Sequence, residues 1–150
     1  MVEQKYLDDF NPDDRFVTGG ITLTESDMID FALRYDPQPF HLDAHAASES
    51  AFGGLIASGY QTLALCFRLF IQSGILTDAS MGSPGIDELR WLSPVRPGDT
   101  LHTTVDVKEV IPSKSKPDRG IVRFRYAAIN QHGDEVLSFV LNPFLRRRLA

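Results

Sequence analysis

Residues 60–73 are the stretch that most constrains how this chain of 150 residues can fold. Only Gln61, Arg68 and Gln72 are clearly polar there, and apolar residues occupy nearly every side of the helix that the stretch predicts. A helix that is apolar nearly all round must be buried. Gly74 follows directly and is a natural residue to end the helix. We therefore expect one long helix in the centre of the molecule.

Shorter elements precede this helix, and strands follow it. A strand over residues 15–23 is interrupted by Gly19-Gly20, as at a bulge. Thr24 is a suitable N-cap for a helix that must stop near Tyr35, and Asp43 can cap a second short helix that ends at about Ser50. Four strands in an antiparallel meander are then expected, over residues 86–92, 101–111, 121–130 and 135–145.

A single buried helix with no other helix to cover it must be wrapped by the sheet itself. The sequence therefore predicts the α+β class and a hot-dog fold, in which a curved antiparallel sheet wraps around a long central helix. We expect one such domain over residues 1–150. One sheet of this kind leaves free edges and an open face, so we also expect a homodimer or a larger dimer-based oligomer.

Composition narrows the classes of partner. The formal net charge of -5 argues against nucleic acid as the main partner. Cys66 is the only cysteine, so no intrachain disulfide can form, and we expect its thiol to be buried and inert among apolar neighbours. The N-terminal residues lack a signal-peptide pattern, and no apolar run approaches the ~18 residues of a membrane span. We therefore expect a soluble cytoplasmic protein without membrane contact.

Asp36 and His41 frame the stretch that carries the candidate chemistry. Pro37 pushes Asp36 out of the helical region, and Pro39 does the same to Gln38. We expect an extended segment on which Asp36 and His41 can aim at one point. A second stretch ends in Ser58-Gly59 at the mouth of the apolar helix, where a backbone N–H is a preformed site for negative charge. An acid, a base and an oxyanion site are the parts needed for proton chemistry beside a carbonyl.

Each of these residues also has a simpler interpretation. Aspartate is common in turns before proline, which would explain Asp36. A single histidine such as His41 is more often structural than catalytic. Gly59 fits a tight packing position, and Ser58 a helix N-cap. Metal binding is a rival for the polar cluster Asp36, His41, Asp43 and His45, but no cysteine or further histidine completes a set of ligands with the usual spacing.

Four sequence blocks closely resemble the MaoC-like dehydratase family, which includes the R-specific enoyl-CoA hydratases. The blocks are Tyr35 to His41 with Ala47, Gly54 to Gly59, Leu92 to Asp99, and Ser115 to Gly120. Within them the chain departs from the usual family pattern at three positions. Gln38 replaces an asparagine, Phe40 replaces a small aliphatic residue, and Ser58 stands where many hydratases have histidine.

The resemblance implies an enzyme that reversibly hydrates a trans-2-enoyl-CoA to the (R)-3-hydroxyacyl-CoA, as in fatty acid metabolism. It implies catalytic roles for Asp36, His41 and Gly59, and substrate contacts from a wider set of residues. These are Gln38, Phe40, Ser58, Lys114, Lys116 and Arg119. The three cations are candidates to meet the phosphates of coenzyme A, while a solvated hairpin loop is the simpler interpretation of them. We expect neither metal nor redox cofactor, with coenzyme A present only as part of the substrate.

Two other functions remain open at this stage. A hot-dog acyl-CoA thioesterase needs a carboxylate or positioned water aimed at the carbonyl carbon, and would not need the paired His41. A non-catalytic acyl-CoA-binding subunit would keep the fold, but it has no reason to hold both Asp36 and His41. The length and branching of the acyl chain cannot be predicted from these residues.

Overall fold

The computed structural model describes residues 2–148 of the chain. In chain order the elements are a 3-10 turn (Leu7–Asp9), β1 (Arg15–Thr22), α1 (Glu25–Tyr35), α2 (Pro39–Leu42), α3 (Ala44–Ser48), α4 (Gly59–Ile71), β2 (Ile86–Trp91), β3 (Thr100–Pro112), β4 (Arg119–Ile129), β5 (Glu135–Leu141) and β6 (Phe144–Arg146). None of the helices in these residues is long and apolar enough to cross a membrane.

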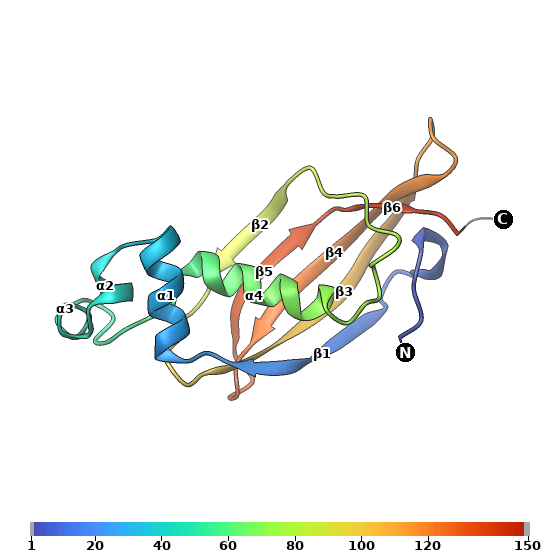
Figure 1. The fold of residues 1–150 in the computed structure, drawn as a ribbon. Helices are drawn as coiled ribbons and strands as arrows, with labels where there is room; N and C mark the ends of the chain where they lie inside the picture. Colours follow the sequence, from blue (N-terminus) through green and yellow to red (C-terminus); the bar gives the residue numbers. More distant parts are fainter. Residues whose placement is uncertain (1, 149–150) are drawn as a thin grey trace.

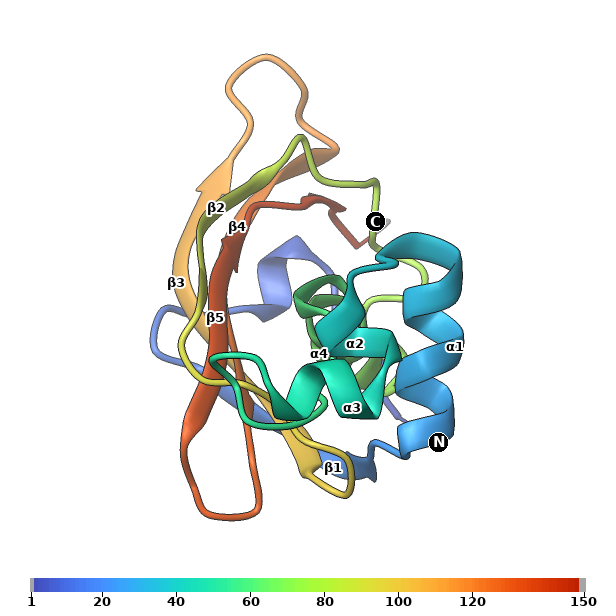
Figure 2. The same cartoon turned by 90° about the vertical axis from the view of Figure 1, so that its left-hand side faces the viewer.

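The strands form one antiparallel sheet in the order β1-β3-β4-β5-β2, with β6 paired to β4. The sheet curves around α4, and all four helices lie on the same side of it (Figures 1 and 2). This arrangement confirms the expected hot-dog fold. The register of β1 against β3 shifts between Val17 and Gly20, which confirms the bulge expected at the glycine pair.

Two details of the predicted topology are wrong. β3, β4 and β5 do form a meander, but β2 lies at the far edge and pairs with β5. The last expected strand is two strands, because the chain breaks at Asn142 and Pro143 before β6. Proline has no N–H for the ladder and restricts its own backbone, so the strand cannot continue through it. β6 then pairs with the first residues of β4 instead.

The core lies between α4 and the concave face of the sheet. Phe70 of α4 meets Phe124 and Tyr126 of β4 edge to face, with ring centroids 5.9 and 5.7 Å apart. Cys66 is fully buried, as expected, and burial raises the pKa of its thiol to about 12. The helix is not covered all round, however, because Tyr60 is 60% exposed. One side of α4 is therefore open in a single chain.

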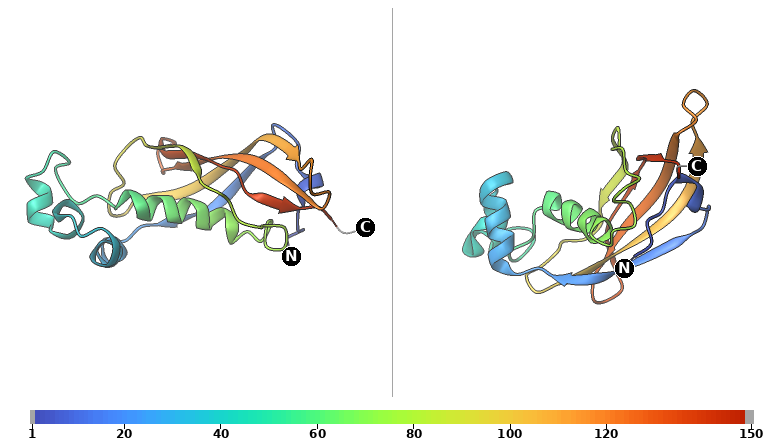
Figure 3. Two further views of the ribbon diagram at one scale, coloured as in Figure 1. Left: turned by 90° about the horizontal axis from the view of Figure 1, so that it is seen from above. Right: turned by 45° about the vertical axis from the view of Figure 1, so that its right-hand side comes forward.

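The short helices gather at the N-terminal end of α4. Thr24 caps α1 by accepting a hydrogen bond from the Asp27 N–H, and Asp43 caps α3 through the N–H groups of His45 and Ala46. Both caps confirm the sequence predictions. Figure 3 shows α2 and α3 beyond this end of α4, while the hairpin between β3 and β4 projects from the opposite end of the molecule. The two ends thus carry different sets of candidate functional residues.

Candidate active site

Local backbone geometry brings Asp36 and His41 together. α1 ends at Tyr35, and Asp36 follows it as the C-cap, with its N–H bonded to the Ala32 carbonyl. Gln38 is extended, as predicted, but Pro39 is the first residue of α2. His41 therefore lies on a helical turn and not on the extended segment expected. Proline suits this first helical position because its missing N–H would have had no intrahelical acceptor.

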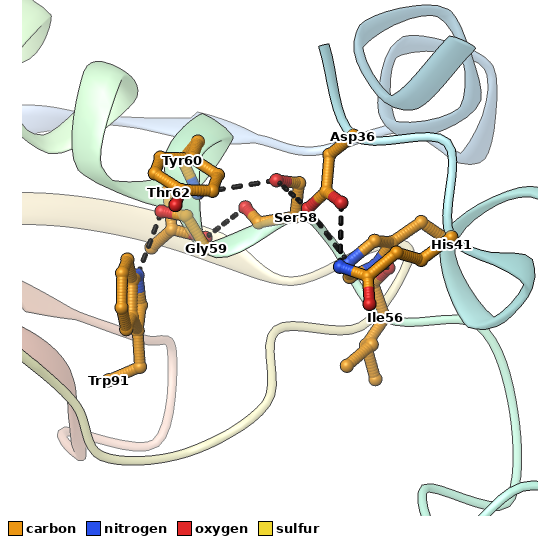
Figure 4. Close-up of polar contacts among 9 residues, drawn as sticks. Asp36, His41, Ile56, Ser58, Gly59, Tyr60, Thr62 and Trp91 are labelled. Carbon is orange, nitrogen blue, oxygen red and sulfur yellow. Dashed lines mark hydrogen bonds and ion pairs between the residues drawn. The ribbon is translucent and has the colours of Figure 1, made fainter.

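Asp36 and His41 form a buried pair. Nε2 of His41 lies 3.1 Å from Oδ2 of Asp36, and Nδ1 of His41 lies 2.8 Å from the carbonyl oxygen of Ile56 (Figure 4). A carbonyl oxygen only accepts, so Nδ1 carries a proton and donates it to Ile56. A hydrogen bond between Nε2 and Oδ2 needs a second proton, held by one of these two atoms. The pair can therefore exchange a proton internally.

Two uncharged side chains hold the Asp36 carboxyl group from both sides. The Gln38 amide donates to Oδ1 over 2.7 Å, and the Ser58 hydroxyl donates to Oδ2 over 2.7 Å. Burial raises the pKa of Asp36, but these two hydrogen bonds and the charge of His41 outweigh it and leave the pKa below its ordinary value. Asp36 is therefore ionised at neutral pH.

Ser58 and Gly59 begin α4 beside the pair. The Ser58 hydroxyl accepts a hydrogen bond from the Tyr60 N–H at 3.3 Å, which confirms the predicted N-cap. Gly59 is the first residue of the helix, and its N–H has no acceptor among residues 2–148. The Trp91 indole covers Gly59 and donates from Nε1 to the Gly59 carbonyl over 2.8 Å. A Cβ atom on Gly59 would overlap this indole.

These groups border a cavity of about 350 Å³. Its polar lining includes Asp36, Gln38 and His41, and Gly59 also lines it. Most other lining residues are apolar or aromatic: Phe52, Ile56, Ala57, Tyr60, Trp91, Leu92, Pro94 and Val95. A mainly apolar cavity with a few converging polar groups is typical of a small-molecule site. The buried pair and a helix N-terminus at its wall give this cavity the parts for acid–base chemistry.

A model of the MaoC like domain matches residues 9–128. The chain belongs to the MaoC-like dehydratase family. It is 33% identical to the uncharacterized protein YdeM of Bacillus subtilis over 94% of this chain and 99% of that protein. It is 32% identical to the 3-hydroxybutyryl-CoA dehydratase of Methylorubrum extorquens, over 77% of this chain and 68% of that enzyme. The crystal structure of a MaoC-like dehydratase from Rhodospirillum rubrum has a TM-score of 0.90 and 38% identity, covering 97% and 99% of the two chains. The sequence resemblance is thereby confirmed.

Three predicted substrate contacts of this MaoC-like chain lie elsewhere. Lys114, Lys116 and Arg119 line a separate cavity of about 500 Å³ beneath the hairpin between β3 and β4. Arg119 also pairs with Asp118 at 2.9 Å. The hairpin and the Asp36–His41 pair are at opposite ends of α4 (Figure 1). One chain therefore does not bring the three cations to the cavity that holds the pair, and their role toward phosphates stays a prediction.

Phe40 and Ser58 were also predicted to contact the substrate, but they contact the Asp36–His41 pair and do not line the cavity. Phe40 packs edge to face on the His41 ring, with centroids 4.5 Å apart, and it does not line the cavity. Ser58 is fully buried, so its side chain meets Asp36 and not the open space of the cavity. Among the substrate-binding residues predicted from this part of the chain, Gln38 is the one whose side chain borders the cavity.

The four residues considered for a metal site, Asp36, His41, Asp43 and His45, do not gather into one set of ligands. Asp43 is occupied as the cap of α3, and His45 is exposed and lies 3.6 Å from Glu49. Within residues 2–148, no three His, Cys, Asp or Glu side chains are grouped so that they could hold a metal ion. The acid–base interpretation of Asp36 and His41 therefore has the stronger geometric support.

Sequence reasoning missed two contributors to the site. The Ile56 carbonyl, which orients His41, is a backbone group and leaves no signal in the residue type. Trp91 is the single tryptophan of the chain and ends an edge strand, yet the residue is 48% exposed and borders the cavity. The only feature of the sequence that could have indicated a role for Trp91 is the presence of a large aromatic residue at the end of a predicted strand.

Proposed function

We propose that this MaoC-like chain reversibly hydrates a trans-2-enoyl-CoA to the (R)-3-hydroxyacyl-CoA. The observation that carries the proposal is the buried Asp36–His41 pair, which borders an apolar cavity beside the N-terminus of α4. The pair has one proton to exchange, and the Gly59 N–H has no acceptor within the described chain. The family resemblance supports the (R) configuration in this proposal.

The proposed reaction adds water across the carbon–carbon double bond. Asp36 and His41 hold one water molecule, and one of them accepts its proton as oxygen bonds to C3. The other gives a proton to the α-carbon, so the atoms of one water are added. Negative charge develops on the thioester oxygen in between, and the Gly59 N–H stabilises it as an oxyanion donor. No cofactor is proposed beyond the coenzyme A of the substrate.

A spectrophotometric assay with crotonyl-CoA tests the proposal. Hydration removes the conjugated-enoyl absorbance without releasing a thiol. Release of free thiol would show the alternative activity, a hot-dog thioesterase. Binding of crotonyl-CoA with neither change would indicate a non-catalytic acyl-CoA-binding subunit. Either result, if it held across a panel of enoyl-CoA chain lengths, would contradict the proposed function.

The cations of the hairpin cavity are proposed to contact the phosphates of coenzyme A. These phosphates lie at the far end of the long pantetheine arm from the thioester, so a phosphate site remote from the reacting atoms is chemically reasonable. Replacing Lys114 and Lys116 by alanine is expected to raise KM for crotonyl-CoA by up to about thirtyfold, from ~1 kcal/mol for each exposed ion pair. The value of kcat should not change, and the effect should weaken as salt is added.

Crotonyl-pantetheine, which lacks the phosphates, is the matched substrate control, and its KM should be equal for the variant and the original chain. Lys108→Ala is the matched protein control, because Lys108 is exposed on β3 outside the hairpin cavity. If the double variant and Lys108→Ala have the same KM for crotonyl-CoA, the hairpin lysines do not bind phosphate.

We also propose that the chain functions as at least a dimer. Large apolar side chains are exposed on α4 and beside the edge strand β2, among them Tyr60, Phe67, Ile86 and Leu92. Burying such a surface against a second chain is favourable. Sedimentation velocity at micromolar concentration should show a dimer or larger species, and a stable monomer would contradict this expectation.

A further inference from the structure

Arg96 ties the loop after α3 to the body of the protein; we call residues 51–54 the Phe52 loop. The Arg96 guanidinium donates from Nη1 to the Gly54 carbonyl at 3.2 Å and from Nη2 to the Phe52 carbonyl. The planar fork of an arginine suits two acceptors at once, and hydrogen bonds from a charged donor are stronger than neutral ones. Within the described chain, these two are the hydrogen bonds that join the loop to anything beyond its own turn at Ser50. The hydrogen bonding of the loop to the rest of the fold therefore depends on one side chain.

The turn in front of β3 fixes the backbone of Arg96. The Arg96 N–H donates to Asp99 Oδ2 at 2.9 Å, and the Asp99 N–H donates back to the Arg96 carbonyl at 3.0 Å. The Gln131 side-chain amide donates to the other carboxylate oxygen of Asp99 at 2.9 Å. The backbone of Arg96 is thus anchored to the sheet side of the molecule, and its guanidinium is left to bind the loop.

Phe52 is the loop residue that reaches the cavity of the Asp36–His41 pair. It lines that cavity and is partly exposed. Its ring packs on the Phe40 ring with centroids 5.3 Å apart, and the Phe40 ring packs in turn on His41. A partly exposed aromatic ring in the wall of an apolar cavity offers contact area to a bound ligand. Displacing Phe52 would therefore remove part of the cavity wall.

The chain beyond the Phe52 loop is held independently of Arg96. The N–H groups of Ile56 and Ala57 donate to backbone carbonyls outside the loop, at 3.2 and 2.8 Å. The Ile56 carbonyl, which orients His41, therefore belongs to a segment with anchors of its own. Loss of the arginine fork should free the Phe52 loop and leave the Asp36–His41 pair in place.

We propose that Arg96 is a positioning residue for substrate binding: its fork holds the Phe52 ring as a wall of the cavity, and that ring packs on the acyl thioester bound there. This inference rests on the proposed hydration, because the ligand it names is the substrate of that reaction. Arg96 does not line the cavity, so its effect on the substrate must pass through the loop that it holds. Packing on an apolar wall stabilises substrate and transition state alike, so it acts on KM and not on kcat.

Arg96→Ala is expected to raise KM for crotonyl-CoA by about tenfold with kcat nearly constant, since an apolar contact of the substrate is lost. Phe52→Ala should have a similar effect. The double variant should raise KM no further than Phe52→Ala alone, because both substitutions remove the same contact. Arg15→Ala is the matched control: it loses a two-point arginine contact of the same kind, with Asp106 on β3, away from the cavity, and should leave KM unchanged.

Hydrogen–deuterium exchange tests the fork without relying on activity. The amides of the Phe52 loop should exchange faster in Arg96→Ala than in the original chain or in Arg15→Ala, while the amides of Ile56 and Ala57 keep their protection. Arg96→Lys keeps the charge but lacks the fork, so its exchange and its KM should lie between those of the original chain and Arg96→Ala. The lysine variant takes the place of Arg96→Ala if the alanine variant does not fold.

Three results would overturn the role of Arg96. These are a KM equal to that of the original chain, exchange of the Phe52 loop that the substitution leaves unchanged, and effects of Arg96→Ala and Phe52→Ala that multiply in the double variant. An original chain that shows the fork-dependent exchange but hydrates no enoyl-CoA would instead overturn the proposed function, and would leave the hold of Arg96 on Phe52 standing.

Discussion

Asp36→Asn and His41→Gln are each expected to lower kcat on the best enoyl-CoA substrate by about 10²–10⁴, the range for positioned acid–base groups. Both side chains border the cavity, and they lie 3.1 Å apart. Because both act on one water, the double variant should be about as slow as the slower single variant. Initial rates with each protein at saturating substrate provide the measurement.

Folding controls show whether these losses are chemical. The Asp36→Asn variant keeps a side-chain oxygen that can accept from Ser58, so it should still fold, with a lower melting temperature near pH 7 because the stabilising carboxylate is gone. The folded-state pKa of Asp36 is lowered, so its ionised form contributes stability above its unfolded pKa that is lost as pH falls. Between neutral and acid pH, the melting temperature of Asp36→Asn should therefore fall less than that of the original chain. Near-full activity of either single variant would refute the catalytic assignment of the pair.

The caps and ends of the helices were predictable because their causes are local. Thr24, Asp43 and Ser58 each bond to an N–H within three residues, so residue type and position suffice. α1 stops at Tyr35 because Pro37 disfavours the helical conformation at the preceding residue. The helical turn at Pro39 was missed because proline was interpreted only as a helix breaker, although it also favours the first position of a helix.

The order of the strands was less predictable because pairing joins distant residues. Nothing in the residues of β2 distinguishes β5 from β3 as its neighbour, since both strands offer an apolar face.

The geometry of the site was hard to predict for the same reason. The approach of Ser58 to Asp36, 22 positions away, depends on the path of α2 and α3, and no pattern in the sequence states it. Lys114 and Lys116 were grouped with the pair because their charges suit the phosphates of coenzyme A, and the fold places their hairpin at the other end of α4.

Gly59→Ala is expected to lower kcat by about 10²–10³, the usual loss when one oxyanion donor is removed. The structure gives the mechanism: the new Cβ would overlap the Trp91 indole, so the first turn of α4 must shift and carry the Gly59 N–H away from the thioester. The melting temperature should fall only modestly, because Trp91 is about half exposed and its side chain can move. Rates and melting curves of the same preparations measure both quantities.

A second substitution tests whether that collision is the cause. Trp91→Ala removes the indole, so Gly59→Ala made in the Trp91→Ala background should lose little further kcat. Ser58→Ala is not a suitable control here, since Ser58 also contacts Asp36. If Gly59→Ala unfolds the protein while the remaining folded fraction turns over normally, Gly59 is only a packing position beneath Trp91.

Replacing Gly59 by glycolic acid tests the donor itself, because the backbone ester lacks the N–H and adds no Cβ to meet the indole. Nothing in the described chain accepts a hydrogen bond from this N–H, so its loss breaks no bond. The Ser58 carbonyl, which accepts from the N–H groups of Gln61 and Thr62, becomes a weaker ester acceptor, so we expect a modest fall in melting temperature. We expect kcat to fall by about 10²–10³ with KM nearly constant, since the oxyanion exists only as the reaction proceeds. An ester variant with undiminished kcat would show that the enolate oxygen is stabilised elsewhere, and the collision with Trp91 would then be the whole effect of Gly59→Ala.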